Sequence, residues 1–269
     1  MTVRVMSISL AAIALLATTA HSQWIKISLT DTPRNADGTP NLSAPAPRSG
    51  DGKADLSGIW RFGILSRIRR PDKLKEFPLG PIGLDWLMPR GEEIPLLPEA
   101  ASVYKQRILQ SGNGSPSSAC LPHGVPYAML VQQMKIVQTP RLTLILYEEF
   151  NDFRQVFTDG RALPVDPQPT WYGYSVGRWN GDSFVVETAG FNDRSWMDDV
   201  GLAHSEALRT TETFTRRDFG HLDVNVTFDD PRTFTRPWSI SLSFDLQPDT
   251  ELLEYICENN KRAADVRGR

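Results

Sequence analysis

Basic residues and phosphate-binding motifs are scarce in this sequence of 269 residues. It holds 29 lysines and arginines against 32 acidic residues, for a formal net charge of −3. The one tight basic group is Arg67, Arg69 and Arg70, whereas nucleic-acid binders usually carry a longer basic stripe. The sequence also lacks a glycine-rich phosphate loop, a Gly-x-Ser-x-Gly elbow, a His-Glu-x-x-His motif and a Cys-x-x-Cys motif. These absences argue against a nucleic-acid partner and against nucleotide, serine-hydrolase, zincin and thioredoxin-type functions.

Long hydrophobic runs are missing beyond the first residues of the chain. Arg4 precedes an uncharged, largely apolar stretch over residues 5–20, and Thr18, Thr19 and Ala20 close it. This order is typical of a signal peptide. The run is shorter than the roughly 20 apolar residues that a membrane helix needs. We therefore expect residues 1–20 to be a cleaved signal peptide, a periplasmic or secreted location, and no membrane span in the mature chain; a retained anchor is the alternative.

Cysteine occurs only twice, as Cys120 and Cys257. An oxidising compartment favours joining the two. Closing so long a loop contributes roughly 3–5 kcal/mol in the chain-entropy model. We expect a disulfide between the loop around Cys120 and the end of the chain, with two buried free thiols as the alternative.

The chain divides by composition into an arm and one large domain. Residues 21–54 are rich in proline, glycine and small polar residues, which predicts a flexible arm. Residues 55–262 are expected to form a single β domain, and residues 263–269 a C-terminal tail. One helix is predicted over about 99–110, because Pro98 and Glu99 suit a helix start and apolar residues follow at helical spacing.

Short stretches of alternating polarity separated by turn residues fill the second half of the chain. The Asn180-Gly181 step suits a hairpin turn with positive φ. In the run from Leu222 to Phe228 the even-numbered residues are apolar and the odd-numbered ones are mostly polar, so the even ones should point inward. The expected strands are Leu142–Glu149, Phe153–Thr158, Tyr174–Trp179, Ser183–Thr188, Leu208–Arg216, His221–Asp229, Trp238–Leu246 and Leu252–Cys257.

A sheet of eight hairpin-linked strands must either close into a barrel or protect its two edge strands. Up-and-down closure is the simplest topology for sequential neighbours. We therefore predict a mainly β fold, an antiparallel up-and-down barrel of the lipocalin-like (calycin) type with one helix and a long irregular N-terminal arm. A two-sheet β-sandwich is the alternative.

Three polar residues are candidates for catalysis. Strand alternation points Glu212 inward, and a buried carboxylate needs a base, a metal or a wet cavity. His204 and Glu206 precede the same strand and would project to the same side, where imidazole and carboxylate suit proton transfer near neutral pH. A structural ion pair between Glu212 and an arginine such as Arg178 or Arg216 is the competing interpretation.

Aromatic residues gather around the second hairpin. Trp171, Tyr172 and Tyr174 lie close together in the sequence, with Arg178 on the following strand. Aromatic side chains at a barrel mouth commonly line a ligand pocket, so these four residues are candidates for substrate binding. Packing against the core is the alternative role.

Several phrases of the sequence resemble a large family of exported bacterial proteins. The likeness runs from about residue 32 to residue 260, with the phrases in a fixed order. The resemblance implies export and a shared fold, but it does not indicate a catalytic activity. The phrases are Pro33–Gly38, Cys120–Pro126, Ile136–Pro140, Phe157–Arg161 (containing TDGR), Gly173–Asp182 (GYSVGRWNGD), Phe191–Trp196, His204–Glu206 and Glu254–Asn260 (EYICENN).

Two functions remain open at the level of sequence. The first is a cofactor-independent lyase, isomerase or hydrolase that acts on a small, partly apolar organic molecule through a His/Glu proton-transfer site. The second is a non-catalytic binding or carrier module for a hydrophobic small ligand. Neither requires a metal or a cofactor, and the expected partner is a small molecule in both.

Overall fold

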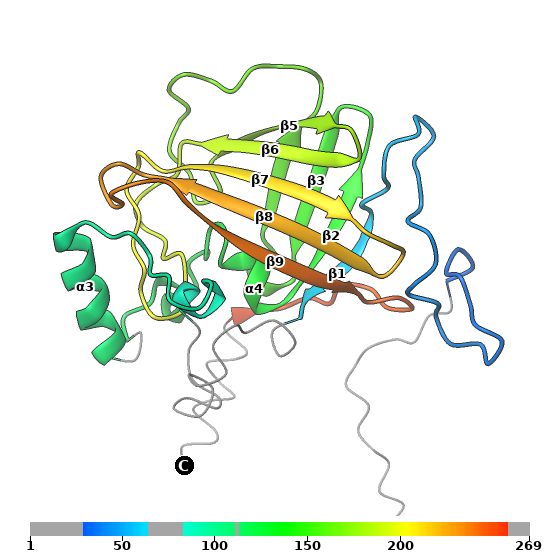
Figure 1. The fold of residues 1–269 in the computed structure, drawn as a ribbon, viewed down its shortest axis with the longest axis horizontal. Helices are drawn as coiled ribbons and strands as arrows, with labels where there is room; N and C mark the ends of the chain where they lie inside the picture. The colour runs from blue at the N-terminus through cyan, green and yellow to red at the C-terminus, as the bar shows by residue number, and fades with distance from the viewer. Residues whose placement is uncertain (1–28, 64–82, 111–112, 258–269) are drawn as a thin grey trace, which may run out of the picture.

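The computed structural model describes residues 29–63, 83–110 and 113–257. The expected signal peptide, the basic group Arg67 to Arg70 and the C-terminal tail lie outside these residues. Within them, nine strands close into one barrel (Figure 1). The strands are β1 (Gly58–Phe62), β2 (Gln133–Gln138), β3 (Leu142–Tyr147), β4 (Phe153–Phe157), β5 (Tyr174–Asn180), β6 (Ser183–Ala189), β7 (Arg209–Arg216), β8 (His221–Asp229) and β9 (Trp238–Leu246).

Each strand pairs with its neighbour in the sequence, and β1 pairs with β9 to close the barrel, so the predicted barrel is confirmed over the sandwich. The two predicted hairpins, β3 with β4 and β5 with β6, are present. Gly181 has φ +60°, as its turn requires. The pair β4 and β5 departs from the expected pattern because it is parallel.

The predicted strand Leu252–Cys257 is wrong. The end of β9 pairs with β1 instead, through Trp60↔Leu246 and Phe62↔Phe244. Leu252–Cys257 lies beyond that closure and carries no strand. The apolar residues in the segment suggested a strand, but the closed ladder offers it no free edge.

The interior of the barrel is filled by side chains. Even-numbered residues of β8 and β9 point inward as predicted, and Val226, Leu242 and Phe244 are fully buried. Large rings meet in the middle: Phe184 and Phe214 have centroids 6.3 Å apart. Small barrels pack in this way when their inward positions are bulky and apolar. The described residues thus fill the barrel with a packed apolar core.

Helix α3 (Pro98–Leu109) confirms the predicted helix and packs outside the barrel (Figure 1). Its buried Tyr104 donates a hydrogen bond of 2.7 Å to the carboxylate of Asp198. The other short helices are η1 (Leu84–Leu87), η2 (Pro116–Ala119), α4 (Ala128–Val131) and η3 (Glu149–Asn151). Among the residues described, no helix combines the length and the apolar character that crossing a membrane demands.

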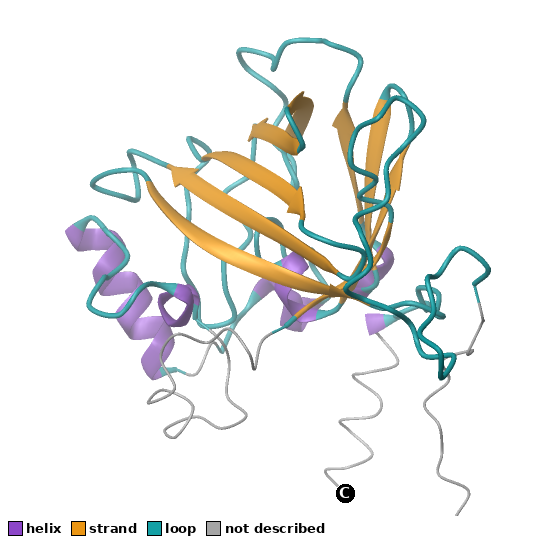
Figure 2. Cartoon of the chain, turned by 45° about the vertical axis from the view of Figure 1, so that its right-hand side comes forward, coloured by secondary structure: helices purple, strands orange, loops and turns teal. Residues whose placement is uncertain are grey.

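The described part of the N-terminal arm lies against the barrel (Figure 2). The backbone N–H of Phe219 donates to the carbonyl of Ala44 at 2.7 Å, which fixes the arm beside the turn between β7 and β8. Arg34 forms an ion pair with Asp249 at 2.5 Å. These contacts join the arm to the turn between β7 and β8 and to the segment that follows β9.

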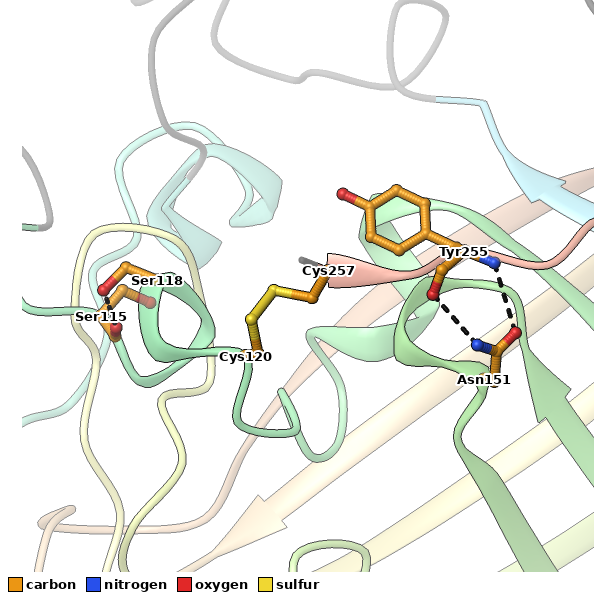
Figure 3. Close-up of a disulfide and its surroundings, with 6 residues drawn as sticks. All are labelled: Ser115, Ser118, Cys120, Asn151, Tyr255 and Cys257. Atoms are coloured by element: carbon orange, nitrogen blue, oxygen red, sulfur yellow. Dashed lines mark hydrogen bonds between the residues drawn. A yellow bond between two sulfur atoms is a disulfide. The ribbon is translucent and has the colours of Figure 1, made fainter. Parts of the chain in front are cut away.

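Cys120 and Cys257 form a disulfide, as the sequence predicted (Figure 3). Beside the disulfide, the side chain of Asn151 donates to the carbonyl of Tyr255 at 3.1 Å and accepts from its N–H at 3.3 Å. The ring of Phe150 packs edge-on against that of Tyr255. The disulfide and these contacts hold the C-terminal segment against the turn between β3 and β4.

Candidate functional site

A cleft of about 410 Å³ opens where β4 meets β5. Only two residue pairs join these parallel strands, Val156↔Ser175 and Phe157↔Val176. The first half of β4 therefore has no partner on this side, and the chain reaches β5 through residues 158–173, which cross the outside of the barrel. The cleft opens beside this short parallel ladder between β4 and β5.

Five aromatic side chains line this cleft. They are Phe153, Phe157, Trp171, Tyr172 and Tyr174. Tyr172 stacks on the buried Tyr147 with centroids 5.3 Å apart, and Tyr174 stacks on Phe157 at 5.1 Å. Phe153 is 58% exposed, so one wall presents a large apolar surface to solvent. Rings held by stacking give a ligand a rigid apolar surface.

Three of the four residues predicted to bind substrate lie together in this cleft: Trp171, Tyr172 and Tyr174. The fourth, Arg178, does not. It is exposed and forms an ion pair with Glu187 on β6. Arg178 lies on the same outward face of β5 as Tyr174, but four residues further along the strand, which carries it away from the cleft.

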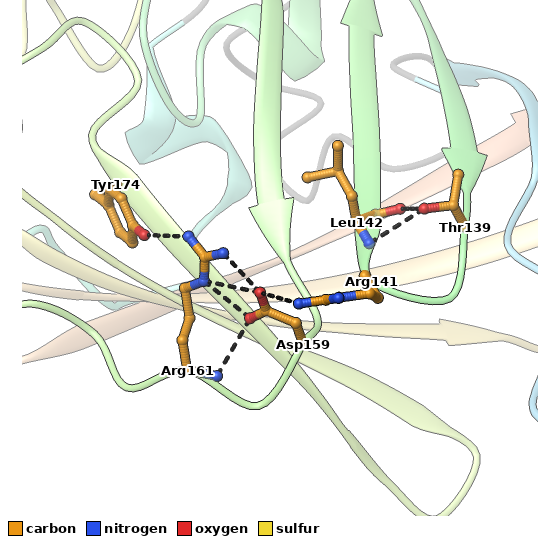
Figure 4. Close-up of polar contacts among 6 residues, drawn as sticks. All are labelled: Thr139, Arg141, Leu142, Asp159, Arg161 and Tyr174. Atoms are coloured by element: carbon orange, nitrogen blue, oxygen red, sulfur yellow. Dashed lines mark hydrogen bonds and ion pairs between the residues drawn. The ribbon is translucent and has the colours of Figure 1, made fainter.

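A charged group stands beside Tyr174 (Figure 4). Arg161 donates a hydrogen bond of 2.9 Å to the Tyr174 hydroxyl and lies 4.0 Å from the centre of the Phe157 ring. It also binds the carboxylate of Asp159 and lowers the pKa of Asp159 to about 2. Arg161 thus fixes the two rings, and it shares the Asp159 carboxylate with Arg141.

Beneath the cleft lies a buried polar network. The guanidinium of Arg154 binds both carboxylate oxygens of Glu212, and it donates to Ser175 at 2.9 Å and to Thr188 at 2.6 Å. The side chains of Arg154 and Glu212 are 1% and 0% exposed. Burial opposes the charge on Arg154, but the Glu212 carboxylate outweighs it and raises the pKa of Arg154. Glu212 therefore points inward, as predicted, and is held by an arginine.

The structure does not join the three predicted catalytic residues. The hydrogen bonds of Glu212 go to Arg154. Those of His204 go to Ser195 and to the carbonyl of Ser205. Glu206 is exposed in the loop before β7, beside a separate surface groove. The inference that all three share one side fails because residues 204–206 precede the strand and do not continue its alternation.

His204 forms a buried pair with a serine. Its Nε2 lies 2.9 Å from the hydroxyl oxygen of Ser195, and its Nδ1 lies 3.1 Å from the carbonyl of Ser205. Burial lowers the pKa of His204. A Cβ added at Gly124 would come within 2.7 Å of the Ser195 hydroxyl, so this pair packs tightly against the loop that follows Cys120. The pair therefore packs the segment between β6 and β7 against that loop.

A second polar cluster escaped the sequence analysis. His123 lies 3.0 Å from the carboxylate of Glu149, and both are largely buried. Beside them, Tyr172 donates a hydrogen bond of 2.9 Å to Asp152. Burial raises the pKa of Asp152, while the Tyr172 hydrogen bond and the nearby His123 lower it. Asp152 lines the cleft, so this cluster brings a carboxylate to its wall.

One sequence signal could have pointed to His123. His123 stands between Pro122 and Gly124 in a loop close to one of the two cysteines, where a covalent anchor would fix its position. Glu149 and Asp152 flank a tight turn in which Phe150 has φ +61°. Residues held in left-handed conformations often mark functional turns.

The structure gives no support for a metal centre. In residues 29–63, 83–110 and 113–257, no group of three or more His, Cys, Asp or Glu side chains could hold a metal ion.

The carboxylate of Asp198 accepts hydrogen bonds from Tyr104, from Leu84 and from the backbone of its own loop. It therefore stabilises a loop and does not orient the imidazole of His204.

Models of known protein families, curated proteins and solved structures were compared with this chain, and none matches. The likeness to exported bacterial proteins therefore remains a prediction from the sequence. The cleft between β4 and β5, with its aromatic walls and the Asp152 carboxylate, is the candidate functional site.

Proposed function

We propose that this chain is an exported small-molecule-binding protein that holds a partly apolar organic ligand in the cleft between β4 and β5. The observation that carries the proposal is the gathering of Trp171, Tyr172 and Tyr174 with the exposed Phe153 around one opening. Clefts lined by rigid aromatic rings with a few polar groups are the usual form of a small-molecule site. Export to the periplasm or beyond, with loss of the signal peptide, belongs to the same proposal.

The ion pair that Glu212 forms inside the barrel favours binding over catalysis. Glu212, the first candidate for acid or base, is locked to Arg154 and hydrogen-bonded on both oxygens. A carboxylate held in this way stabilises the fold and is poorly placed to exchange a proton with a ligand. The barrel core is packed, so the surface cleft carries the ligand.

A proton-transfer enzyme is the second candidate, and a specific observation supports it. The pair His123 and Glu149 lies next to Asp152, so imidazole and carboxylates stand behind the wall of the cleft. To separate the two functions, the molecule that copurifies with the native protein would be incubated with fresh protein and its mass and isomeric form followed. An unchanged molecule supports binding alone. A change that wild type causes and His123→Gln does not would support the enzyme.

The binding proposal is tested by mutation of its aromatic wall. Trp171→Ala should weaken binding of naphthylmethanol, a neutral apolar probe, by roughly tenfold or more, because a large ring surface leaves the cleft. Trp196→Ala is the matched control, since Trp196 lies outside the cleft against Arg107. Titration calorimetry measures both. Equal affinity in Trp171→Ala and wild type would contradict the proposal.

A further inference from the structure

The charge balance of the cleft points to the kind of ligand it holds. Its ionisable lining includes Arg154 and Asp152. The guanidinium of Arg154 donates hydrogen bonds to Glu212, Ser175 and Thr188 inside the barrel. The Glu212 carboxylate therefore neutralises its charge there. Within the part of the chain that the structure describes, no arginine or lysine pairs with Asp152.

The surroundings of Asp152 leave an excess of negative charge. Its Oδ2 accepts a hydrogen bond from the neutral hydroxyl of Tyr172. The nearest imidazole, His123, stands 3.0 Å from the carboxylate of Glu149. Two carboxylates thus share one imidazole, so the ionised cluster stays negative even when His123 is protonated.

The arginines near the opening do not reverse this sign at the wall. Arg161 is bound to the Tyr174 hydroxyl and shares the Asp159 carboxylate with Arg141, and neither arginine lines the cleft. Arg194 lies over the Trp171 ring, with 5.1 Å to its centre, and it does not line the cleft. A carboxylate at the wall and aromatic rings around it are the two features that recognise an organic cation.

We propose that the ligand of this cleft carries a protonated amine on an apolar body, with the Asp152 carboxylate as its counter-charge and the rings of Trp171, Tyr172 and Tyr174 around the body. This inference rests on the proposed function, because it names the ligand class of the same cleft.

Three probes with one ring system test the proposal: naphthylmethylamine, naphthylmethanol and naphthoate. Calorimetry on the wild type at neutral pH should rank the amine roughly tenfold or more above the alcohol, because the ammonium adds an ion pair with Asp152 to the hydrogen bond that both probes can make. Naphthoate should bind most weakly. Tighter binding of naphthoate than of the alcohol would overturn the proposal.

Asp152→Asn keeps the size of the side chain and an acceptor for Tyr172 while it removes the charge. The amine should then fall to the affinity of the alcohol, and the alcohol should be unchanged. Glu187→Gln is the matched control, since it removes a carboxylate from the outer face of the barrel, where it pairs with Arg178. Survival of the amine preference in Asp152→Asn would overturn the proposal.

A pH titration of the wild type needs no variant. Acidification protonates Asp152, whose pKa burial raises, and the groups that face it are Tyr172, His123 and Glu149. The hydroxyls of Tyr172 and Tyr147 stay neutral throughout, since burial raises the pKa of each. Loss of the Asp152 charge makes the cleft less negative, so the amine preference should shrink as pH falls. A preference that is constant or grows would overturn the proposal.

The outcomes separate this inference from the proposed function. Binding of naphthylmethanol that depends on Trp171, without a preference for the amine, refutes the inference alone. If none of the three probes binds, the proposed function fails, and the inference fails with it.

Discussion

Replacing Glu212 with glutamine removes one charge from the interior of the barrel and leaves Arg154 there. The two side chains are 0% and 1% exposed, so water cannot take the place of the lost carboxylate. Ser175 and Thr188 still accept from the guanidinium, but neither carries a charge. Breaking a buried ion pair from one side costs about 3–5 kcal/mol. We expect Glu212→Gln to lower the free energy of unfolding by about that amount.

Urea unfolding at neutral pH measures this loss, as a lower midpoint with an unchanged slope. The control is Glu187→Gln, because Glu187 pairs with Arg178 at the surface, where such pairs contribute about 0–1 kcal/mol. The double variant Arg154→Met with Glu212→Leu should regain much of the lost stability, since no unpaired charge is left inside. If Glu212→Gln costs no more than Glu187→Gln, Glu212 is not a structural partner of Arg154, and a working role for it returns.

Three further predictions concern the disulfide, the strand register and the buried histidine. Replacing both Cys120 and Cys257 with alanine should lower the free energy of unfolding by about 2–4 kcal/mol in urea; mass spectrometry showing free thiols in the native protein would contradict the bridge. Val226→Asp should prevent folding while Asn225→Asp is tolerated, as followed by circular dichroism, because only Val226 points into the core; equal effects would refute the register. Burial lowers the pKa of His204, so the unfolded chain binds a proton at this residue near pH 6.5 while the folded chain does not. The free energy of unfolding should therefore decrease as pH falls below about 6.5, and less so in His204→Gln; parallel pH profiles would contradict this.

Local pattern predicted most of the barrel. The alternation from Leu222 to Phe228 sets the inward face of β8 without knowledge of its partners, and the Asn180-Gly181 step specifies a turn by itself. The pairing of β1 with β9 could not be predicted from local pattern. The two strands lie far apart in the sequence, and nothing in the residues around Trp60 or Leu246 indicates which strand each will pair with. The same limit explains the false strand at Leu252–Cys257.

The site was predictable only where its residues are neighbours in the sequence. Trp171, Tyr172 and Tyr174 could be recognised as a group because they are almost contiguous. The parallel seam that makes them a cleft depends on where residues 158–173 cross the barrel, which no periodicity reveals. Asp152 and His123 come together through a tight turn and a loop close to the disulfide, so their contact belongs to the tertiary structure alone.

The parity argument succeeded for Glu212 and failed for the loop before it. Alternation holds along a strand because its backbone is extended and paired. It therefore placed Glu212 inside β7 correctly. His204 and Glu206 lie in an irregular segment, where each side chain is directed by its own backbone angles, and one is buried while the other is exposed.

A crystal structure of the full chain with bound naphthylmethanol tests the central claim most directly. The claim that the cleft between β4 and β5 holds an apolar ligand predicts the naphthalene ring against Trp171 and Tyr174, with its hydroxyl toward Asp152. A ring bound at another surface, with the cleft between β4 and β5 filled only by water, would contradict the account.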